Sequence, residues 1–243
     1  MKLVIFDIDG TLTQTSAIDE VCFRAAYAEM LELHDISAAL ETCPHVSDTG
    51  ITRHIYQSNL ARAPHDHEEA AICERVVDLL AEHHRRDPAH FAEVSGAVAM
   101  LERLAEKRDW LIAVATGCWR ASAQLKLRAA NIALHDKPAG FAEDGPSRET
   151  IVSAAIERAK QTYNRTSFDK IVSVGDGVWD VKTATNLGLS FVGIGADKRA
   201  ETLRQNGARH ILPDYKDDVS FFSYLEGALI PQPPVNLQRK GTP

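Results

Sequence analysis

The chain has 243 residues, 44% of them hydrophobic and 25% charged, and carries a formal net charge of −7. This length and composition are typical of a globular protein with one large α/β domain, or with a core and an inserted second lobe. The acidic balance argues against a nucleic-acid-binding protein and against a protein of membrane surfaces, because both need a basic footprint.

The cysteines and the N-terminal apolar run indicate the expected compartment. The four cysteines have no CxxC spacing, which argues against a structural zinc site and against a disulfide framework. The run LVIF at residues 3–6 is too short for a signal peptide, and no window of 18 residues is free of charge. We therefore expect a cytoplasmic protein with reduced thiols.

Short apolar runs rich in Val, Ile and Phe alternate with helical patterns along most of the chain. Continuous burial of such runs favours parallel strands covered on both faces, so the pattern predicts an α/β fold with a Rossmann-like, doubly wound parallel sheet. The predicted strands are 2–6, 110–115, 170–175 and 190–195, with a weaker one at 209–212. The predicted helices between and after them are 97–109, 120–132, 147–163, 179–189, 198–208 and 219–229.

The segment 14–90 breaks this alternation. It contains no convincing strand, but amphipathic helical patterns at 17–32, 50–63 and 68–86. We therefore predict an all-helical inserted domain at 14–90 and a catalytic core made of 1–13 and 91–230. The last stretch, 231–243, has four prolines and few packing residues, which predicts a flexible tail.

Polar residues follow three of the predicted strands directly. The first strand ends in Asp7 and Asp9, the second in Thr116 and Gly117, and the third in GDGVWD, which contains Asp176 and Asp180. Ligands of open α/β sheets bind beyond the carboxyl ends of the strands, so these residues are expected at one edge of the sheet. Several carboxylates packed together repel one another unless a cation lies among them, and Mg²⁺ prefers such hard oxygen ligands.

The same residues carry a family resemblance. DIDGTLT, ATG and GDGVWD, in this order, resemble the first, second and fourth motifs of the haloacid dehalogenase (HAD)-like hydrolase superfamily over about residues 1–225. The helical insertion is similar to the helical cap of its phosphoglycolate phosphatase-like branch. The resemblance implies a Mg²⁺-dependent phosphatase that acts on a small phosphorylated metabolite. The acidic composition argues against nucleic-acid and membrane partners, and the sequence leaves the oligomeric state, monomer or dimer, open.

The resemblance also implies a role for each motif residue. Asp7 would be the nucleophile that becomes an aspartyl phosphate, and Asp9 the general acid and base for the leaving oxygen and for water. Two carboxylates are needed because one must stay ionised while the other can hold a proton. Mg²⁺ would bind the Asp7 carboxylate, the Asp9 carbonyl and Asp176, with Asp180 as an additional acidic group.

The remaining motif residues would hold the phosphoryl group and the first turn. Thr116 and the Gly117 amide are expected to bind phosphoryl oxygens. Gly10 fits a tight turn, and Thr11 is expected to steady that turn and to contribute to substrate binding.

The third motif of the superfamily is less clear in this chain. It is a basic residue, usually Lys, near the start of the helix that precedes the fourth-motif strand. Arg148 in GPSRETIV is the best match, while Lys137 in DKPAG lies about ten residues too early. Arg differs from Lys in reach and in hydrogen-bond geometry.

Other functions remain open from the sequence. A phosphomutase would share every motif and keep the phosphate, and a non-catalytic or regulatory protein would keep the fold without turnover. A haloacid dehalogenase normally lacks the second aspartate, so Asp9 argues against it.

Overall fold

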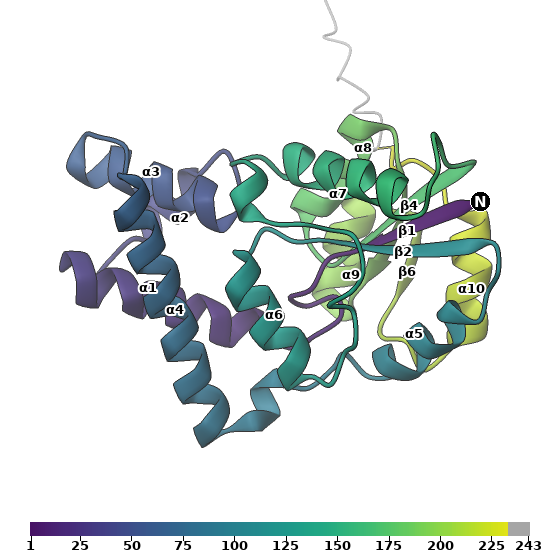
Figure 1. The fold of residues 1–243 in the computed structure, drawn as a ribbon, viewed down its shortest axis with the longest axis horizontal. Helices are drawn as coiled ribbons and strands as arrows, with labels where there is room; N and C mark the ends of the chain where they lie inside the picture. Colours follow the sequence, from purple (N-terminus) through teal and green to yellow (C-terminus); the bar gives the residue numbers. More distant parts are fainter. Residues whose placement is uncertain (233–243) are drawn as a thin grey trace, which may run out of the picture.

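The structure, a computed structural model, describes residues 1–232 and contains one six-stranded sheet. All neighbouring strands are parallel, in the order β3-β2-β1-β4-β5-β6. This confirms the predicted α/β, Rossmann-like class (Figure 1). The strands are β1 Lys2–Phe6, β2 Trp110–Ala115, β3 Ala139–Gly140, β4 Lys170–Gly175, β5 Ser190–Ile194 and β6 His210–Leu212.

Alternate residues of β1 explain why helices cover both faces of the sheet. Val4 and Phe6 pack into one apolar cluster with residues of α5, α6 and α10, while Leu3 and Ile5 pack into another with residues of α7, α8 and α9. Neither face is left to water, so the strands read as continuous apolar runs. The helices are α5 Ala97–Ala105, α6 Arg120–Ala129, α7 Arg148–Thr162, α8 Val178–Leu187, α9 Asp197–Gln205 and α10 Asp218–Gly227.

One strand of the sheet was not predicted. β3 is two residues long and pairs with Val114 and Ala115 of β2, so it is too short to have a pattern of its own. A Cβ at Gly140 would lie 2.1 Å from the carbonyl oxygen of Ile151, which explains the glycine at this close approach to α7.

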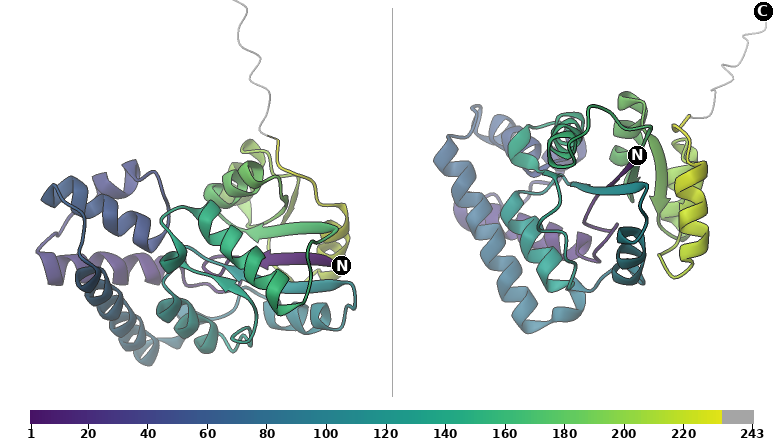
Figure 2. Two further views of the ribbon diagram at one scale, coloured as in Figure 1. Left: turned by 45° about the horizontal axis from the view of Figure 1, so that its top comes forward. Right: turned by 45° about the vertical axis from the view of Figure 1, so that its right-hand side comes forward.

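Four helices follow β1 and gather on one side of the molecule (Figures 1 and 2). Their buried residues form an apolar cluster of their own, which also takes in Trp119 at the start of α6. The carboxyl end of β1 points towards this group. The helices are α1 Ser16–Leu31, α2 Ser37–Thr42, α3 Asp48–Leu60 and α4 Asp66–Arg86, and short 3₁₀ turns follow at Pro88–Phe91 and Ala142–Asp144.

The predicted helices at 17–32, 50–63 and 68–86 correspond to α1, α3 and α4. The short α2 escaped prediction because only Ala39 of its six residues is buried. That these helices are a separate domain bounded at 14 and 90 stays a prediction.

β1 lies at the point of the sheet where the strand order reverses, which is where ligand sites form. The chain passes from β1 through β2 to β3 on one side and then returns to β4, which pairs with β1 on the other side. Ligands bind at such a switch point, beyond the carboxyl ends of the two strands. The backbone N–H of Asp7 donates to the carbonyl of Val174 at 3.0 Å and extends the pairing of β1 and β4 into the first motif.

The sequence also predicts that no segment spans a membrane and that the C-terminal stretch is a tail. Among residues 1–232, no helix combines the length and the apolar character needed to cross a bilayer. The predicted flexible tail at 231–243 lies, from residue 233 onward, outside the described residues.

Candidate active site

Three buried carboxylates meet where β1 and β4 end. Asp7 follows β1, Asp176 follows β4, and Asp180 lies in the first turn of α8; one oxygen of each lies within 4.8 Å of the others. Only 5–7% of each residue is exposed, so water screens their repulsion poorly. The sequence prediction that these turns converge at one edge agrees with this placement.

Gly10 allows the first-motif turn to approach Asp176. Its φ is +74°, in the left-handed region, and a Cβ there would lie 2.1 Å from Asp176 Oδ2. The turn is also held by Thr13, whose backbone N–H and hydroxyl both donate to the Ile8 carbonyl. The Thr11 hydroxyl is buried and has no hydrogen-bond partner among the described residues, so Thr11 supports the turn through its backbone N–H, which donates to the Ile8 carbonyl at 3.2 Å, and not through its hydroxyl.

Gly10→Ala tests this close approach, and the chain contains a matched control. Gly188 also has a positive φ, +67°, but a Cβ there would meet nothing within 4 Å. We expect Gly188→Ala to lower the free energy of unfolding by about 1–2 kcal/mol, the cost of a left-handed non-glycine residue. Gly10→Ala should cost more, because Asp176 must also move. Chemical denaturation of both variants measures the difference, and equal losses would contradict the close approach.

Arg148 supplies a positive charge to this cluster. Its Nη1 lies 3.2 Å from Asp7 Oδ1 and 3.6 Å from Asp180 Oδ1. The guanidinium also packs against Gly117, where a Cβ would lie only 2.8 Å from Arg148 Cζ. Lys137 instead pairs with Asp136, beside a separate cavity near β3. Of the two candidate third-motif residues, the structure therefore places Arg148 beside Asp7.

Arg148 does not neutralise the three carboxylates. Burial, and next the charge of Asp180, raise the pKa of Asp7 to about 7, although Arg148 acts in the opposite direction. Burial and the charge of Asp7 raise the pKa of Asp176 to about 7, and burial raises that of Asp180 to about 6. The cluster thus has more negative charge than its surroundings compensate.

The cluster fits a Mg²⁺ ion by an independent criterion. Asp176 Oδ1 is buried and has no hydrogen-bond partner among the described residues. An unpartnered buried carboxylate oxygen is costly unless a ligand or ion satisfies it. Mg²⁺ is typically held by one or two carboxylates with waters and substrate phosphate, and the donors here are of that type.

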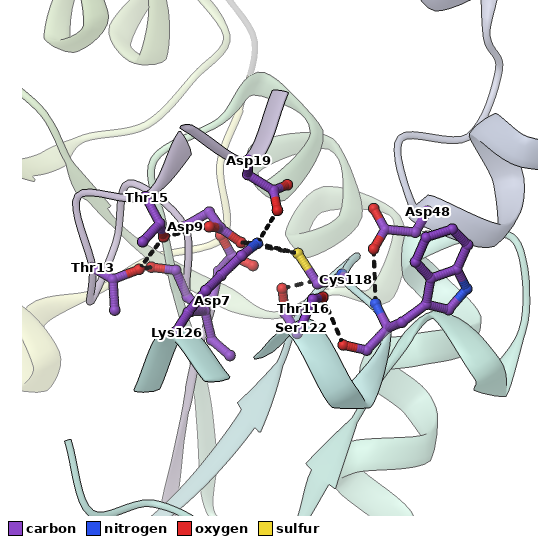
Figure 3. A network of polar contacts seen from close by, with 12 residues as sticks. Asp7, Asp9, Thr13, Thr15, Asp19, Asp48, Thr116, Cys118, Ser122 and Lys126 are labelled. Atoms are coloured by element: carbon purple, nitrogen blue, oxygen red, sulfur yellow. Dashed lines mark hydrogen bonds and ion pairs between the residues drawn. The ribbon is translucent and has the colours of Figure 1, made fainter. Parts of the chain in front are cut away.

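The Asp9 side chain takes part in a different network (Figure 3). Its Oδ2 accepts hydrogen bonds from Lys126 Nζ at 2.9 Å and from Cys118 Sγ at 2.9 Å, and its Oδ1 accepts one from the Thr15 hydroxyl at 2.5 Å. The two aspartates of the first motif therefore have different surroundings. Asp7 belongs to the carboxylate cluster, and Asp9 is paired with a lysine.

Lys126 links Asp9 to α1. The lysine is fully buried, and its Nζ also lies 2.5 Å from Asp19 Oδ1 of α1. Asp9, Asp19 and Cys118 form a second group with the spacing of metal ligands, but the ammonium of Lys126 already contacts all three. This group is thus balanced by an internal cation.

The pKa values of the two first-motif aspartates differ in direction. Burial alone would raise the pKa of Asp9, but the charge of Lys126 and the hydrogen bonds from Cys118, Thr15 and Lys126 outweigh it and hold the pKa below its usual value. From the family resemblance, Asp9 is expected to be the carboxylate that can hold a proton. In the structure it is Asp9 that is kept ionised and Asp7 whose pKa is raised.

The second motif lies next to the first and contacts α3. Thr116 is buried, and its hydroxyl accepts a hydrogen bond from the Cys118 N–H at 3.3 Å. The Gly117 carbonyl accepts one from the Asp48 N–H at 2.7 Å, and the Asp48 carboxylate accepts one from the Trp119 N–H at 2.8 Å. The start of α3 is therefore attached to the loop expected to hold phosphoryl oxygens.

Comparison with known proteins places these motifs in a family. Residues 4–185, three quarters of the chain, match the family described as haloacid dehalogenase-like hydrolase. The chain belongs to the haloacid dehalogenase-like hydrolases. The resemblance stated from DIDGTLT, ATG and GDGVWD is thereby confirmed, and the match begins within β1 and ends within α8.

Solved structures of other proteins have the same fold at low sequence identity. A hydrolase from Pseudomonas syringae is 19% identical, with 93% of this chain and 99% of that chain covered and a TM-score of 0.68. A predicted phosphoglycolate phosphatase from Haemophilus somnus is 17% identical, with 91% of this chain and 98% of that chain covered and a TM-score of 0.60. A provisionally assigned β-phosphoglucomutase from Bacteroides vulgatus is 12% identical, with 94% of this chain and 90% of that chain covered and a TM-score of 0.61. No curated protein matches the sequence significantly.

Proposed function

We propose that this HAD-like hydrolase is a Mg²⁺-dependent phosphatase that hydrolyses a small phosphate monoester through an aspartyl phosphate on Asp7. The observation that carries the proposal is the carboxylate cluster of Asp7, Asp176 and Asp180, with Arg148 against it, at the switch point between β1 and β4. The choice of reaction is supported by the family match and by structural neighbours that are described as a phosphoglycolate phosphatase and a β-phosphoglucomutase.

In this proposal Asp7 attacks the phosphoryl group. Bound Mg²⁺ would be held by the Asp7 and Asp176 carboxylates and the Asp9 carbonyl, and would supply the positive charge that lets an anionic nucleophile approach an anionic substrate. Arg148 adds charge to the same side and orients Asp7 through the 3.2 Å contact. Thr116 and the Gly117 amide bind phosphoryl oxygens.

Asp9 acts on the leaving oxygen and then on water. Its pairing with Lys126 keeps it ionised before substrate binds, so it must first take up a proton to serve as an acid. To act as a base on the water that hydrolyses the aspartyl phosphate, Asp9 must be ionised, which is the form that its surroundings favour.

The segment before α3 lies against the site, which favours a small substrate. The Val46 carbonyl accepts a hydrogen bond from Arg148 Nε at 2.6 Å, and the Ser47 hydroxyl donates one to the Pro146 carbonyl at 2.6 Å. With the Asp48 contact to Gly117, these bonds bring the segment before α3 against the expected phosphoryl site. Such closure excludes bulk water while the aspartyl phosphate forms.

The experiment that tests this function is phosphate release from a panel of small phosphate monoesters, with Mg²⁺ and with the metal chelated. We expect release of phosphate from at least one ester. Chelation should abolish this release, because no divalent cation then offsets the repulsion between the Asp7 carboxylate and the anionic substrate. Release that persists undiminished without any divalent metal would contradict the proposal.

The two other functions left open by the sequence have different outcomes in the same panel. A phosphomutase would convert one phosphate ester into an isomer with little free phosphate, which chromatography of the products detects. A non-catalytic protein would change none of the esters.

A further inference from the structure

Arg199 is a second arginine at the carboxylate cluster, and no motif points to it. Its Nη1 lies 2.7 Å from Asp176 Oδ2, while Asp176 Oδ1 is buried without a partner among the described residues. One oxygen of this carboxylate is thus anchored, and the other is left for a ligand. The side chain of Arg199 is 48% exposed, so its guanidinium reaches the buried carboxylate from the surface.

The loop between β5 and α9 gives Arg199 a path to Asp176. A Cβ at Gly195 would lie 2.7 Å from both Cγ and Cδ of Arg199, so the glycine leaves room for the arginine stem to cross the end of β5. The chain then turns at Asp197, which has a φ of +46°, and places Arg199 in the first turn of α9. This contact therefore depends on two local features, the small residue and the left-handed turn.

We infer that Arg199 is a positioning residue of the metal site: it holds Asp176 through Oδ2 so that Oδ1 faces a bound Mg²⁺. This inference rests on the proposed Mg²⁺-dependent function and extends it to a residue outside the motifs. Partners that hydrogen-bond a metal-ligating carboxylate fix its orientation, and their loss typically weakens metal binding by 10–100-fold.

The positive charge of Arg199 also repels a bound Mg²⁺, which opposes the gain from orienting Asp176, but this repulsion is the smaller effect. A cation near a Mg²⁺ site repels the metal, so its removal could strengthen binding. Because the guanidinium is half exposed, water screens this repulsion. The rotation of the Asp176 carboxylate, by contrast, changes a direct ligand.

The test is calorimetric titration of Mg²⁺ into metal-free protein, for wild type, Arg199→Ala, Arg199→Lys and Arg204→Ala. Arg204 is the matched control, because it lies on the same helix and is 58% exposed in a 3.8 Å pair with Glu201. We expect Mg²⁺ binding to weaken 10–100-fold in Arg199→Ala, to recover in part in Arg199→Lys, and to be unchanged in Arg204→Ala.

A second measurement separates positioning from general damage. In Arg199→Ala the Mg²⁺ concentration needed for half-maximal phosphate release should rise by a similar factor, while kcat at saturating Mg²⁺ stays near the wild-type value. Mg²⁺ affinity in Arg199→Ala that is equal to or tighter than wild type would overturn the inference alone. Absence of Mg²⁺ binding to the wild type would overturn the proposed metal site and the inference with it.

Discussion

Asp7→Asn is expected to lower kcat for Mg²⁺-dependent phosphate release by a factor on the order of 10⁴ or more, because loss of a nucleophile removes the covalent step itself. The amide cannot form an aspartyl phosphate. It keeps the size of the carboxylate and an oxygen that can accept the Arg148 hydrogen bond. Steady-state phosphate release from the best ester of the panel, for wild type and variant side by side, measures the effect.

The same variant should fold normally. Burial and the neighbouring carboxylate of Asp180 raise the pKa of Asp7 to about 7, so the ionised form is disfavoured in the metal-free protein. Removing that charge is therefore not expected to lower the free energy of unfolding. Asp136→Asn, at an exposed residue paired with Lys137, is the control and should leave kcat unchanged. Full activity in Asp7→Asn would show that another residue is the nucleophile.

Lys126→Met is expected to lower the free energy of unfolding by about 3–5 kcal/mol, the cost of leaving buried charges without their partner. The lysine is fully buried and contacts the carboxylates of Asp9 and Asp19. Methionine has a similar volume, so the loss reports on charge rather than on packing. Denaturation by urea measures it. Lys137→Met, at an exposed pair with Asp136, should cost no more than about 1 kcal/mol.

A double variant tests whether the loss in Lys126→Met comes from the carboxylates that the lysine leaves unpaired. In Lys126→Met with Asp19→Asn, one of the two uncompensated carboxylates is also removed, so the double variant should be less destabilised than Lys126→Met by itself. A loss below about 1 kcal/mol in Lys126→Met would mean that the ammonium does not stabilise this network.

The sheet and the active-site turns were predictable because they depend on local, strong signals. The continuous apolar runs of β1, β2, β4 and β5 can be buried only in a covered parallel sheet, and Asp7 and Asp176 then have to meet at its edge. The two-residue β3 carries no such pattern, since its pairing is set by β2 and by the approach of α7 at Gly140.

Lys126, Asp19 and Arg199 were not predicted from the sequence, because their partners lie in other elements of the fold and none of the three belongs to a motif. Lys126 lies 117 residues from Asp9, and its place within α6 reads as an ordinary polar helix position. One weak signal existed. The helical spacing places Lys126 one turn from Ala123, which is fully buried, and a lysine on a buried face requires a partner. Arg199 in KRAETLRQ reads as a solvated helix face.

Detection of the aspartyl phosphate itself tests whether Asp7 is the nucleophile. Wild-type protein mixed with the best ester and Mg²⁺, quenched in acid and reduced with borohydride, should carry homoserine in place of Asp7 in its N-terminal peptide, as read by mass spectrometry. Asp7→Asn and the chelated wild type should show no such change. Phosphate release at full rate without this modification, or with the phosphate on another residue, would contradict the account.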